Sequence, residues 1–198
     1  MLRIGLTGGI GSGKTTVSDQ FRQLYKIPVI DADEISRELL SISGKAYDEV
    51  VSLFGSECLL NSGEIDRKLL REKIFTDNKL RASLENIVHP KVRAEILLQA
   101  STLSTQYCLI VIPLLIESNM QSIVDRILVI NTNKQNQLDR VSSRDKCSKN
   151  HVEAIVDSQI TLEERIKHAD DVITNNGDLK SLILQIHQLH QKYLDLTI

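Results

Sequence analysis

A glycine-rich loop near the start of the chain carries the residues with the clearest chemistry. Residues 8–15 read GGIGSGKT and fit the pattern G-x-x-x-x-G-K-[ST] at every fixed position. In such a loop the glycines let backbone N–H groups face an anion, the lysine reaches the β- and γ-phosphates, and the Ser or Thr hydroxyl ligates Mg²⁺. We therefore predict a nucleoside triphosphate site in which Lys14 contacts the phosphates and Thr15 holds Mg²⁺.

The elements around this loop fit the same pattern. Residues 2–7 form a short apolar segment typical of a strand, and Val17, Phe21, Leu24 and Tyr25 then follow at helical spacing. A phosphate loop joins a strand to a helix, and the positive N-terminal end of that helix adds to the anion site. The alternative is a glycine-rich turn followed by a lysine by chance, which this context disfavours.

Further apolar runs predict a parallel sheet. Residues 28–30, 107–112, 126–130 and 171–174 read as strands, and the two middle runs are continuous and β-branched. Such runs are typical of strands that are buried on both faces of a parallel sheet. Because helical patterns alternate with these strands, we predict an α/β fold with helices on both faces of the sheet.

The helical patterns begin at recognisable residues. Asp66 and Asp178 each precede an apolar helical repeat, and Thr161 stands three residues before Glu164 in a capping-box pair. Pro90, after His89, is predicted to open a helix.

The predicted organisation is a single domain of two parts. Residues from about 43 to 103 carry helical patterns without a strand, so we predict a helical cap inserted into a core of about 1–42 and 104–198. Ligands of such folds bind at the carboxyl edge of the sheet, over which the cap would lie.

Composition excludes several classes of protein. The 198 residues have a formal net charge of −2, which gives no basic field for nucleic acid. The three cysteines are widely separated and form no C-x-x-C, which predicts free thiols in a reducing compartment. No apolar run is long enough to span a membrane. We expect a cytoplasmic protein with no membrane contact and no obligate protein partner.

The sequence around the loop favours a kinase over a GTPase or an ATP-driven motor. None of the nine glycines has an aspartate three residues before it, so the D-x-x-G contact of GTPases is missing. Residues 133–136 read NKQN, where a guanine site needs aspartate at the last position. The strands that end at Ile112 and Ile130 have no acidic residue there, so the motor's Walker-B carboxylate is missing too.

Asp33 is the carboxylate nearest to a strand end. A carboxylate there could accept the proton of an acceptor hydroxyl and aim its oxygen at the γ-phosphorus. The alternative is that Asp33 only caps a helix over residues 34–40. The residues alone leave these two interpretations open.

Two arginines and a histidine also allow either a functional or a structural interpretation. Arg140 and Arg144 share a helix face, which suits a mobile lid over phosphates or a solvated surface with Asp145. His89 could line an acceptor pocket or bind a loop carbonyl. The other histidines lack metal-ligand spacing with cysteine or acidic partners and are interpreted as structural or solvated: His151, His168, His187 and His190.

Taken together, these motifs resemble the dephospho-coenzyme A kinase family. The matching pieces are LTGGIGSGK at 6–14, IDAD at 30–33, HP at 89–90, PLLxE at 113–117, QLxRxxxRD at 137–145 and ADDVIxNNG at 169–177. They occur in the family's order and span nearly the whole chain. The phosphate loop alone is shared by many families, whereas the combination is far more specific.

The resemblance implies a three-layer P-loop NTPase fold and transfer of the γ-phosphate of ATP to the 3′-hydroxyl of dephospho-CoA, with Mg²⁺. It assigns Asp33 as the base, Lys14, Arg140 and Arg144 as further catalytic residues, and residues 135–165 as the lid. The implied ATP contacts are Gly8, Gly9, Gly11, Ser12, Gly13, Lys14, Thr15, Thr16, Asn175 and Asn176. The implied acceptor contacts are Asp33, His89, Pro113, Leu114, Leu115 and Glu117, and Thr15 is the metal ligand.

One departure from the family's pattern and two alternative functions have to be stated. Many family members have an aspartate where this chain has Val111, so no metal or structural role for that aspartate carries over. A kinase of the same fold for another small-molecule or nucleoside monophosphate acceptor is the alternative enzyme. A nucleotide-binding regulatory module without phosphotransfer is the alternative from another class.

Overall fold

The computed structural model describes residues 1–197 and divides the chain into two compact units. The core unit comprises Met1–Asp31 and Ala100–Ile198, and the helical unit comprises Ala32–Gln99. The sequence placed the boundaries of the helical part at about 43 and 103 instead. Its interpretation as a substrate-binding cap stays a prediction.

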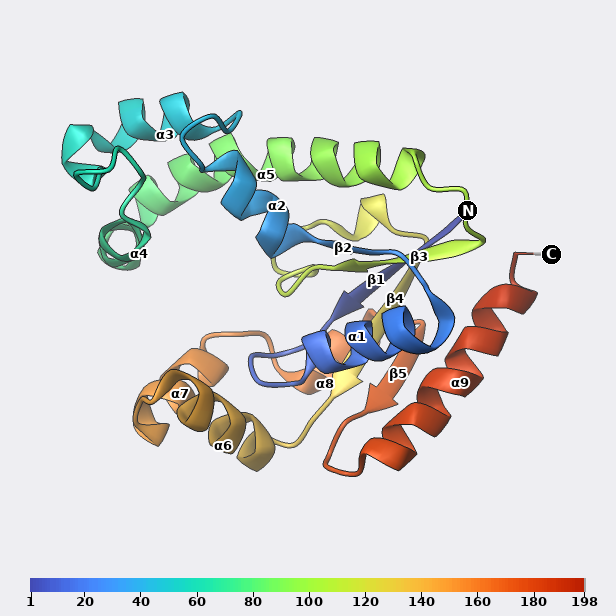
Figure 1. Cartoon of the computed structure of the whole chain (residues 1–198). Helices are drawn as coiled ribbons and strands as arrows, with labels where there is room; N and C mark the ends of the chain where they lie inside the picture. Colours follow the sequence, from blue (N-terminus) through green and yellow to red (C-terminus); the bar gives the residue numbers. More distant parts are fainter. Residues whose placement is uncertain (198) are drawn as a thin grey trace. The chain divides into compact units, whose positions relative to one another are not determined.

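The core unit is built on a five-stranded parallel sheet in the order β2-β3-β1-β4-β5 (Figure 1). Its strands are β1 (Leu2–Thr7), β2 (Val29–Asp31), β3 (Tyr107–Val111), β4 (Arg126–Asn131) and β5 (Asp171–Thr174). Leu6 lies opposite Val111 of β3 and Leu128 of β4, which fixes the register of the three central strands. The predicted α/β fold with a parallel sheet is confirmed.

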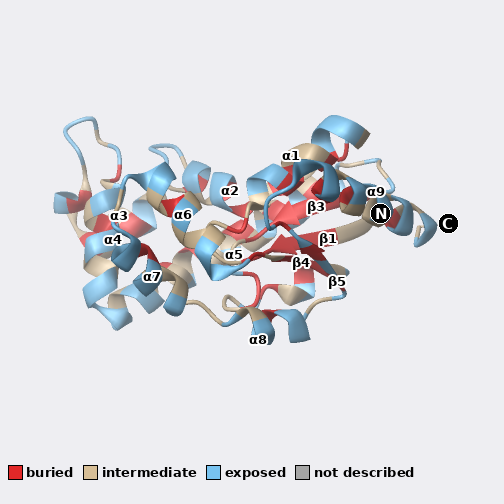
Figure 2. Cartoon of the chain, turned by 90° about the horizontal axis from the view of Figure 1, so that it is seen from below, coloured by how far each residue is buried: buried red, intermediate tan, exposed pale blue. Residues whose placement is uncertain are grey.

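Helices cover both faces of this sheet. The core unit contains α1 (Lys14–Tyr25), the short η2 (Gln121–Ile123), α6 (Lys134–Asp145), α7 (Lys149–Asp157), α8 (Leu162–Lys167) and α9 (Leu179–Asp195). Figure 2 shows α1 and α9 on one side of the sheet and α8 on the other, with buried residues along the strands between them. Ile4, Leu109, Leu128 and Phe21 are fully buried in the resulting core.

The order of the strands creates a switch point at the carboxyl ends of β1 and β3. The chain leaves β1 toward β2 on one side, and it leaves β3 toward β4 on the other side. Open parallel sheets bind ligands in the crevice at such a point, because the two connections diverge there. The glycine-rich loop after β1 and the PLLxE segment after β3 therefore both begin at the place where a ligand site is expected.

A buried carboxylate fixes α9 to the sheet. Asp171, at the start of β5, accepts hydrogen bonds from Arg126 of β4 and from Lys192 and Tyr193 of α9. Burial alone would raise the pKa of Asp171, but the hydrogen bonds from Lys192 and Arg126 outweigh it and hold that pKa below its ordinary value. This network fixes the strand and the helix that flank the turn at Asn175.

The helical unit contains α2 (Ala32–Leu39), α3 (Tyr47–Phe54), the short η1 (Ser56–Cys58), α4 (Arg67–Thr76) and all but the last two residues of α5 (Asn78–Ser101). Asp66 caps α4, as predicted, by accepting from the backbone N–H groups of Lys68 and Leu69. The cap prediction for Asp178 is also confirmed, since its carboxylate accepts from Lys180 and Ser181 at the start of α9.

The prediction that Pro90 opens a helix is wrong. Pro90 lies inside α5, twelve residues after its first residue, Asn78. The helix continues through the proline because buried side chains recur every fourth residue on both sides of it: Leu84, Val88, Val92 and Ile96. The packing of this apolar face outweighs the one backbone hydrogen bond that a proline removes.

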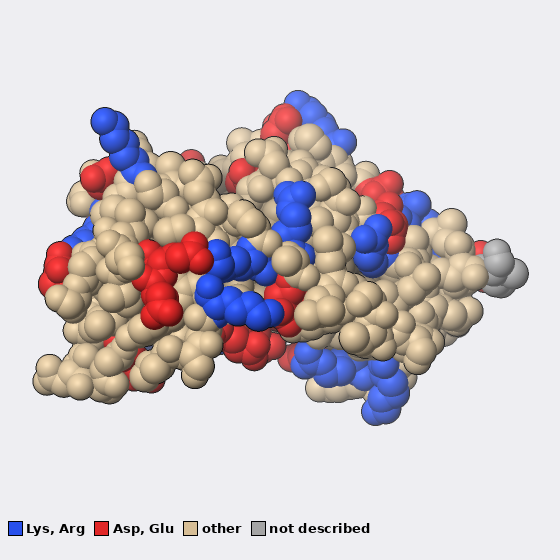
Figure 3. Space-filling view, turned by 90° about the horizontal axis from the view of Figure 1, so that it is seen from above, with Lys and Arg blue, Asp and Glu red and all other residues tan. Residues whose placement is uncertain are grey.

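The surface carries both signs of charge. Figure 3 shows lysine and arginine side chains close to aspartate and glutamate side chains on the face in view. No helix of the described residues is both long enough and apolar enough to cross a membrane. The three cysteines are free thiols, and Cys58 and Cys108 are buried.

Candidate functional site

The glycine-rich loop turns tightly between β1 and α1. Gly11 and Gly13 have φ angles of +71° and +92°, in the left-handed region that glycine adopts without strain. A Cβ at Gly13 would lie 2.2 Å from Nδ2 of Asn175, so a side chain is also excluded by its neighbour. The Lys14 ammonium folds back over the loop and donates to the carbonyls of Gly8, at 2.7 Å, and Gly9, at 3.2 Å.

The loop has the features of an anion site. The side chain of Ser12 is 1% exposed, and its hydroxyl finds no hydrogen-bond partner among the described residues. A buried hydroxyl without a partner is costly, and a ligand oxygen would satisfy it. The N-terminus of α1, at Lys14, adds its partial positive charge at the same place. These residues therefore fit the phosphates of ATP.

Arg140 and Asn175 both contact the loop. The Arg140 guanidinium, from α6, donates to the carbonyls of Gly11, Ser12 and Asn175 at 3.3, 3.4 and 3.0 Å. The buried Asn175 amide donates to the Ser12 carbonyl at 2.8 Å. Two residues that the sequence singled out thus lie against the loop, although they are far from it in the chain.

A cavity of about 210 Å³ opens beside Gly13. It is lined by Gly13, Thr16, Arg140, Asn175, Gly177, Leu179 and Leu182. Loop backbone, a guanidinium and an amide line part of it, and leucine side chains from α9 line the rest. A cavity that combines apolar walls with a few polar groups is typical of sites for small organic ligands.

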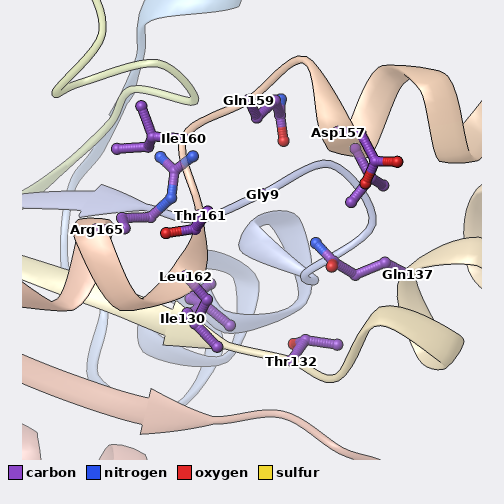
Figure 4. A pocket seen from close by; sticks show the side chains of 11 residues that line it. Gly9, Ile130, Thr132, Gln137, Asp157, Gln159, Ile160, Thr161, Leu162 and Arg165 are labelled. Carbon is purple, nitrogen blue, oxygen red and sulfur yellow. The ribbon is translucent and has the colours of Figure 1, made fainter.

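A second cavity of about 210 Å³ lies beside Gly9 (Figure 4). Gln137 of α6 and Gln159, in the connection between α7 and α8, line it together with Arg165 of α8. Figure 4 shows the two glutamine side chains approaching the loop at Gly9 from different segments of the chain. The Gln137 amide donates to the Ile10 carbonyl at 2.8 Å, and the Gln159 amide oxygen accepts from the Ile10 N–H at 2.9 Å.

Glu117 is held by a buried arginine. The Arg165 side chain is almost completely buried and donates to the two carboxylate oxygens of Glu117 at 2.8 and 3.4 Å. Arg165 also lies 3.5 Å from the hydroxyl of Thr7, which donates to the Pro113 carbonyl at 3.0 Å. This ion pair joins α8 to the PLLxE segment. Glu117 has the position predicted after β3, and its acceptor role stays a prediction.

Arg144 and Asn176 lie farther along the predicted lid and turn. The exposed Arg144 guanidinium forms two hydrogen bonds with Asp145, at 2.7 and 2.8 Å, and these bonds hold the pKa of the Asp145 carboxyl below its ordinary value. Asn176 accepts from the backbone N–H of Asn133 and, through its carbonyl, from the Asn136 amide. Because Asn133 also caps α6, the NKQN segment has a structural role in this chain.

Two of the predicted residues, Asp33 and His89, belong to the helical unit. Asp33 is exposed and lies in the first turn of α2, two residues after β2 ends at Asp31. Its alternative role as the N-cap of a helix over 34–40 is wrong, because the helix already begins at Ala32. His89 lies within α5 rather than in a loop before it.

The residues present also fit a Mg²⁺ ion held mainly by substrate. No group of three or more histidine, cysteine or acidic side chains among the described residues could hold a metal by itself. Mg²⁺ is commonly bound by one or two protein groups together with substrate phosphates. The exposed hydroxyl of Thr15, in the first turn of α1, is available for that role.

The residues that the sequence analysis missed are Gln159 and Arg165, together with the contact made by Gln137. Gln137 was part of a motif, but nothing in its spacing indicated a contact with Ile10, 127 residues earlier. Arg165 stands among charged residues in a short helix and therefore looks like a solvated side chain, yet it is 1% exposed. Only the fold brings these side chains to the loop.

Comparison with known proteins identifies the family of this chain. A family model for dephospho-CoA kinase matches residues 2–181. A dephospho-CoA kinase of Vibrio parahaemolyticus is 39% identical over 98% of this chain and 95% of its own length, and one of Mannheimia succiniciproducens is 42% identical over 98% and 92%. The solved structure of a dephospho-CoA kinase from Campylobacter jejuni is 31% identical, covers 99% of this chain and 98% of its own, and superposes with a TM-score of 0.71. The three-layer P-loop fold is thus confirmed, and the chain belongs to the dephospho-CoA kinase family.

Proposed function

We propose that this protein transfers the γ-phosphate of ATP to the ribose 3′-hydroxyl of dephospho-CoA, giving CoA and ADP. The observation that carries this proposal is the phosphate loop at the switch point of a chain that matches dephospho-CoA kinases over nearly its full length. The transfer is the last step of coenzyme A biosynthesis. The protein is therefore a kinase with two small-molecule substrates.

The loop and its neighbours neutralise charge on the phosphates. Backbone N–H groups from Gly11 to Thr16 cradle the phosphates, and Lys14 leaves the Gly8 and Gly9 carbonyls to contact the β- and γ-phosphates. Arg140 already lies against the loop and spreads the charge of the transition state. Arg144 has to leave Asp145 to join it when the lid closes.

Asp33 acts on the acceptor side of the transfer. Its carboxylate accepts the proton of the 3′-hydroxyl as the bond between O3′ and the γ-phosphorus forms and the bond to the bridging oxygen breaks, which releases ADP. Thr15 would hold Mg²⁺, which would offset the negative charge of the phosphates. His89, Pro113, Leu114, Leu115 and Glu117 are proposed to contact the acceptor.

The cavity beside Gly13 is the proposed site of the adenosine of ATP. Its leucine walls suit the faces of a base, and Asn175 and Asn176 offer polar groups to its edge. The helical unit is proposed to bind the CoA part of the acceptor, and residues 135–165 to close as the lid. We also propose that the protein acts in the cytoplasm and without an obligate protein partner.

An assay of ADP release over a panel of acceptors tests this function. Purified protein with ATP and Mg²⁺ is offered dephospho-CoA, AMP, CMP, shikimate and gluconate in turn. We expect turnover with dephospho-CoA alone. Turnover with a nucleoside monophosphate and none with dephospho-CoA would make this a kinase for another acceptor. ATP binding without transfer to any acceptor would make it a regulatory module.

A further inference from the structure

Two glutamine side chains bind both backbone polar groups of one residue in the phosphate loop. The Gln137 amide donates to the Ile10 carbonyl at 2.8 Å, and the Ile10 N–H donates to the Gln159 amide oxygen at 2.9 Å. We call Gln137 and Gln159 the glutamine clamp. The two residues lie 22 positions apart in the chain, on α6 and after α7, and both contact Ile10 of the loop.

Two glycines of the loop make room for the clamp. A Cβ at Gly9 would lie 2.5 Å from Nε2 of Gln137 and 3.3 Å from Oε1 of Gln159. A Cβ at Gly11 would lie 2.8 Å from the Gln137 carbonyl oxygen. Contacts shorter than about 3 Å do not occur for a real Cβ, so Gly11 is needed for the close approach of the α6 backbone and Gly9 leaves room for the Gln137 amide in its present position.

The clamp acts on the part of the loop that has few other restraints. The carbonyls of Gly8 and Gly9 are held by Lys14, and those of Gly11 and Ser12 are held by Arg140. The Lys14 ammonium and the Arg140 guanidinium are cations, and phosphate oxygens attract them more strongly than backbone carbonyls do. The clamp consists of neutral amides, which phosphate attracts less strongly, so it can hold the loop while the charged groups turn to the nucleotide.

We propose that the glutamine clamp holds the phosphate loop in its ATP-binding conformation and couples it to the helices of the lid. Gln137 and Gln159 are positioning residues, since they bind the loop and not the reacting atoms. This proposal rests on the proposed function and goes beyond it by assigning ATP affinity to two side chains outside the phosphate-binding motif. Gln137 is on the same helix as Arg140, so the clamp also fixes the distance of that arginine from the loop.

The expected kinetic effect is a change in ATP affinity at nearly constant turnover. When a residue is lost that holds the binding-competent conformation, the apparent dissociation constant rises in inverse proportion to the competent fraction. Removal of one neutral hydrogen bond should raise the Kd and the KM for ATP about three- to tenfold. The kcat at saturating ATP and the KM for the acceptor should stay near the wild-type values, because bound ATP restores the loop.

Methionine variants of each glutamine test this directly, since methionine has a similar shape without the amide. Gln137→Met, Gln159→Met and the double variant are compared with Gln135→Met, because the Gln135 amide donates along α6 to Asp139, at 3.0 Å, and not to the loop as far as the described residues show. We expect Gln135→Met to bind ATP like the wild type. Because both clamp residues hold one loop segment, the double variant should lose less affinity than the product of the single losses.

Hydrogen exchange of the Ile10 amide, followed by NMR, gives a readout that does not depend on activity. Gln159→Met should lose protection at Ile10, whereas Gln159→Glu should keep it because a carboxylate oxygen still accepts from the N–H. Gln137→Glu has no donor for the Ile10 carbonyl and should raise the Kd for ATP. If either methionine variant does not fold, the two glutamate variants carry the test.

Two results would overturn the proposal. One is a wild-type Kd for ATP in Gln159→Met although protection of the Ile10 amide is lost. The other is a loss of melting temperature and of active enzyme with an unchanged KM for ATP, which a purely structural role would give. Failure of the proposed function would give a different result. The wild type would then bind ATP with the loop held by the glutamine clamp, but it would not phosphorylate dephospho-CoA.

Discussion

Replacement of Gly13 by alanine should damage the phosphate loop in two ways that the structure separates. Gly13 has a φ of +92°, so alanine there enters the left-handed region at a cost of about 1–2 kcal/mol. The new Cβ would also lie 2.2 Å from Nδ2 of Asn175. The buried amide therefore has to move and lose its hydrogen bond to the Ser12 carbonyl.

The loss of the Asn175 hydrogen bond costs about as much as the backbone strain at Gly13. A buried donor left without its partner costs about 1–3 kcal/mol, so the total for Gly13→Ala is about 2–5 kcal/mol in unfolding free energy. If the loop changes its conformation to avoid this strain, the binding of ATP has to restore the original loop conformation at the same energetic cost. Since about 1.4 kcal/mol corresponds to a factor of ten, the Kd for ATP should rise at least tenfold.

Gly63→Ala is the matched control. Gly63 has a φ of +84°, and a Cβ there would meet no described atom within 4 Å. This variant should show the backbone strain of about 1–2 kcal/mol and a wild-type Kd for ATP. Denaturant unfolding and calorimetric titration with ATP measure both quantities. Equal destabilisation in the two variants, with wild-type ATP affinity in Gly13→Ala, would refute the packing argument at Asn175.

Three further predictions concern other parts of the chain. Asp33→Asn should lower kcat by orders of magnitude with ATP affinity near wild type, as measured by ADP release and titration, and wild-type turnover would remove Asp33 from catalysis. Arg165→Met should lower the unfolding free energy by about 3 kcal/mol, because Glu117 loses its buried partner. Arg144→Met, which breaks an exposed ion pair, should change the unfolding free energy by less than about 1 kcal/mol. Equal effects of the two variants in denaturant unfolding would contradict the burial argument. Asp171→Asn should destabilise the fold at pH 7. The difference in unfolding free energy between wild type and variant should shrink as the pH falls from about 4 through the lowered pKa of Asp171, because protonation of Asp171 removes the same interaction. A difference that does not depend on pH would contradict the role of the ion network.

Local signals in the sequence predicted most of the fold. The runs 107–112 and 126–130 are continuous and apolar because both faces of a central parallel strand are buried, and they correspond to β3 and β4. Thr161 accepts from the N–H of Glu164, as its spacing predicted. The prediction at Pro90 was wrong because it relied on the preference of proline for the start of a helix and did not include the packing of the apolar helix face on both sides of Pro90.

The site was predictable where chemistry lies within one segment. The glycine loop is contiguous, so its pattern revealed it. Arg140 was singled out by its helical spacing with Arg144, and Asn175 by the family resemblance; both contact the loop. The contacts of Gln159 with Ile10 and of Arg165 with Glu117 join segments that are 149 and 48 residues apart. A glutamine or an arginine at such positions looks like any surface residue, because only the fold brings its partner to it.

Transfer to the 3′-hydroxyl of dephospho-CoA can be tested by determining the structure of the product. Protein, ATP and Mg²⁺ are incubated with dephospho-CoA, and the purified product is examined by phosphorus and proton NMR. We expect one new phosphomonoester, coupled to the proton at C3′ of the ribose, and an equal amount of ADP. A phosphate at another position, or ADP formed without a phosphorylated acceptor, would contradict it.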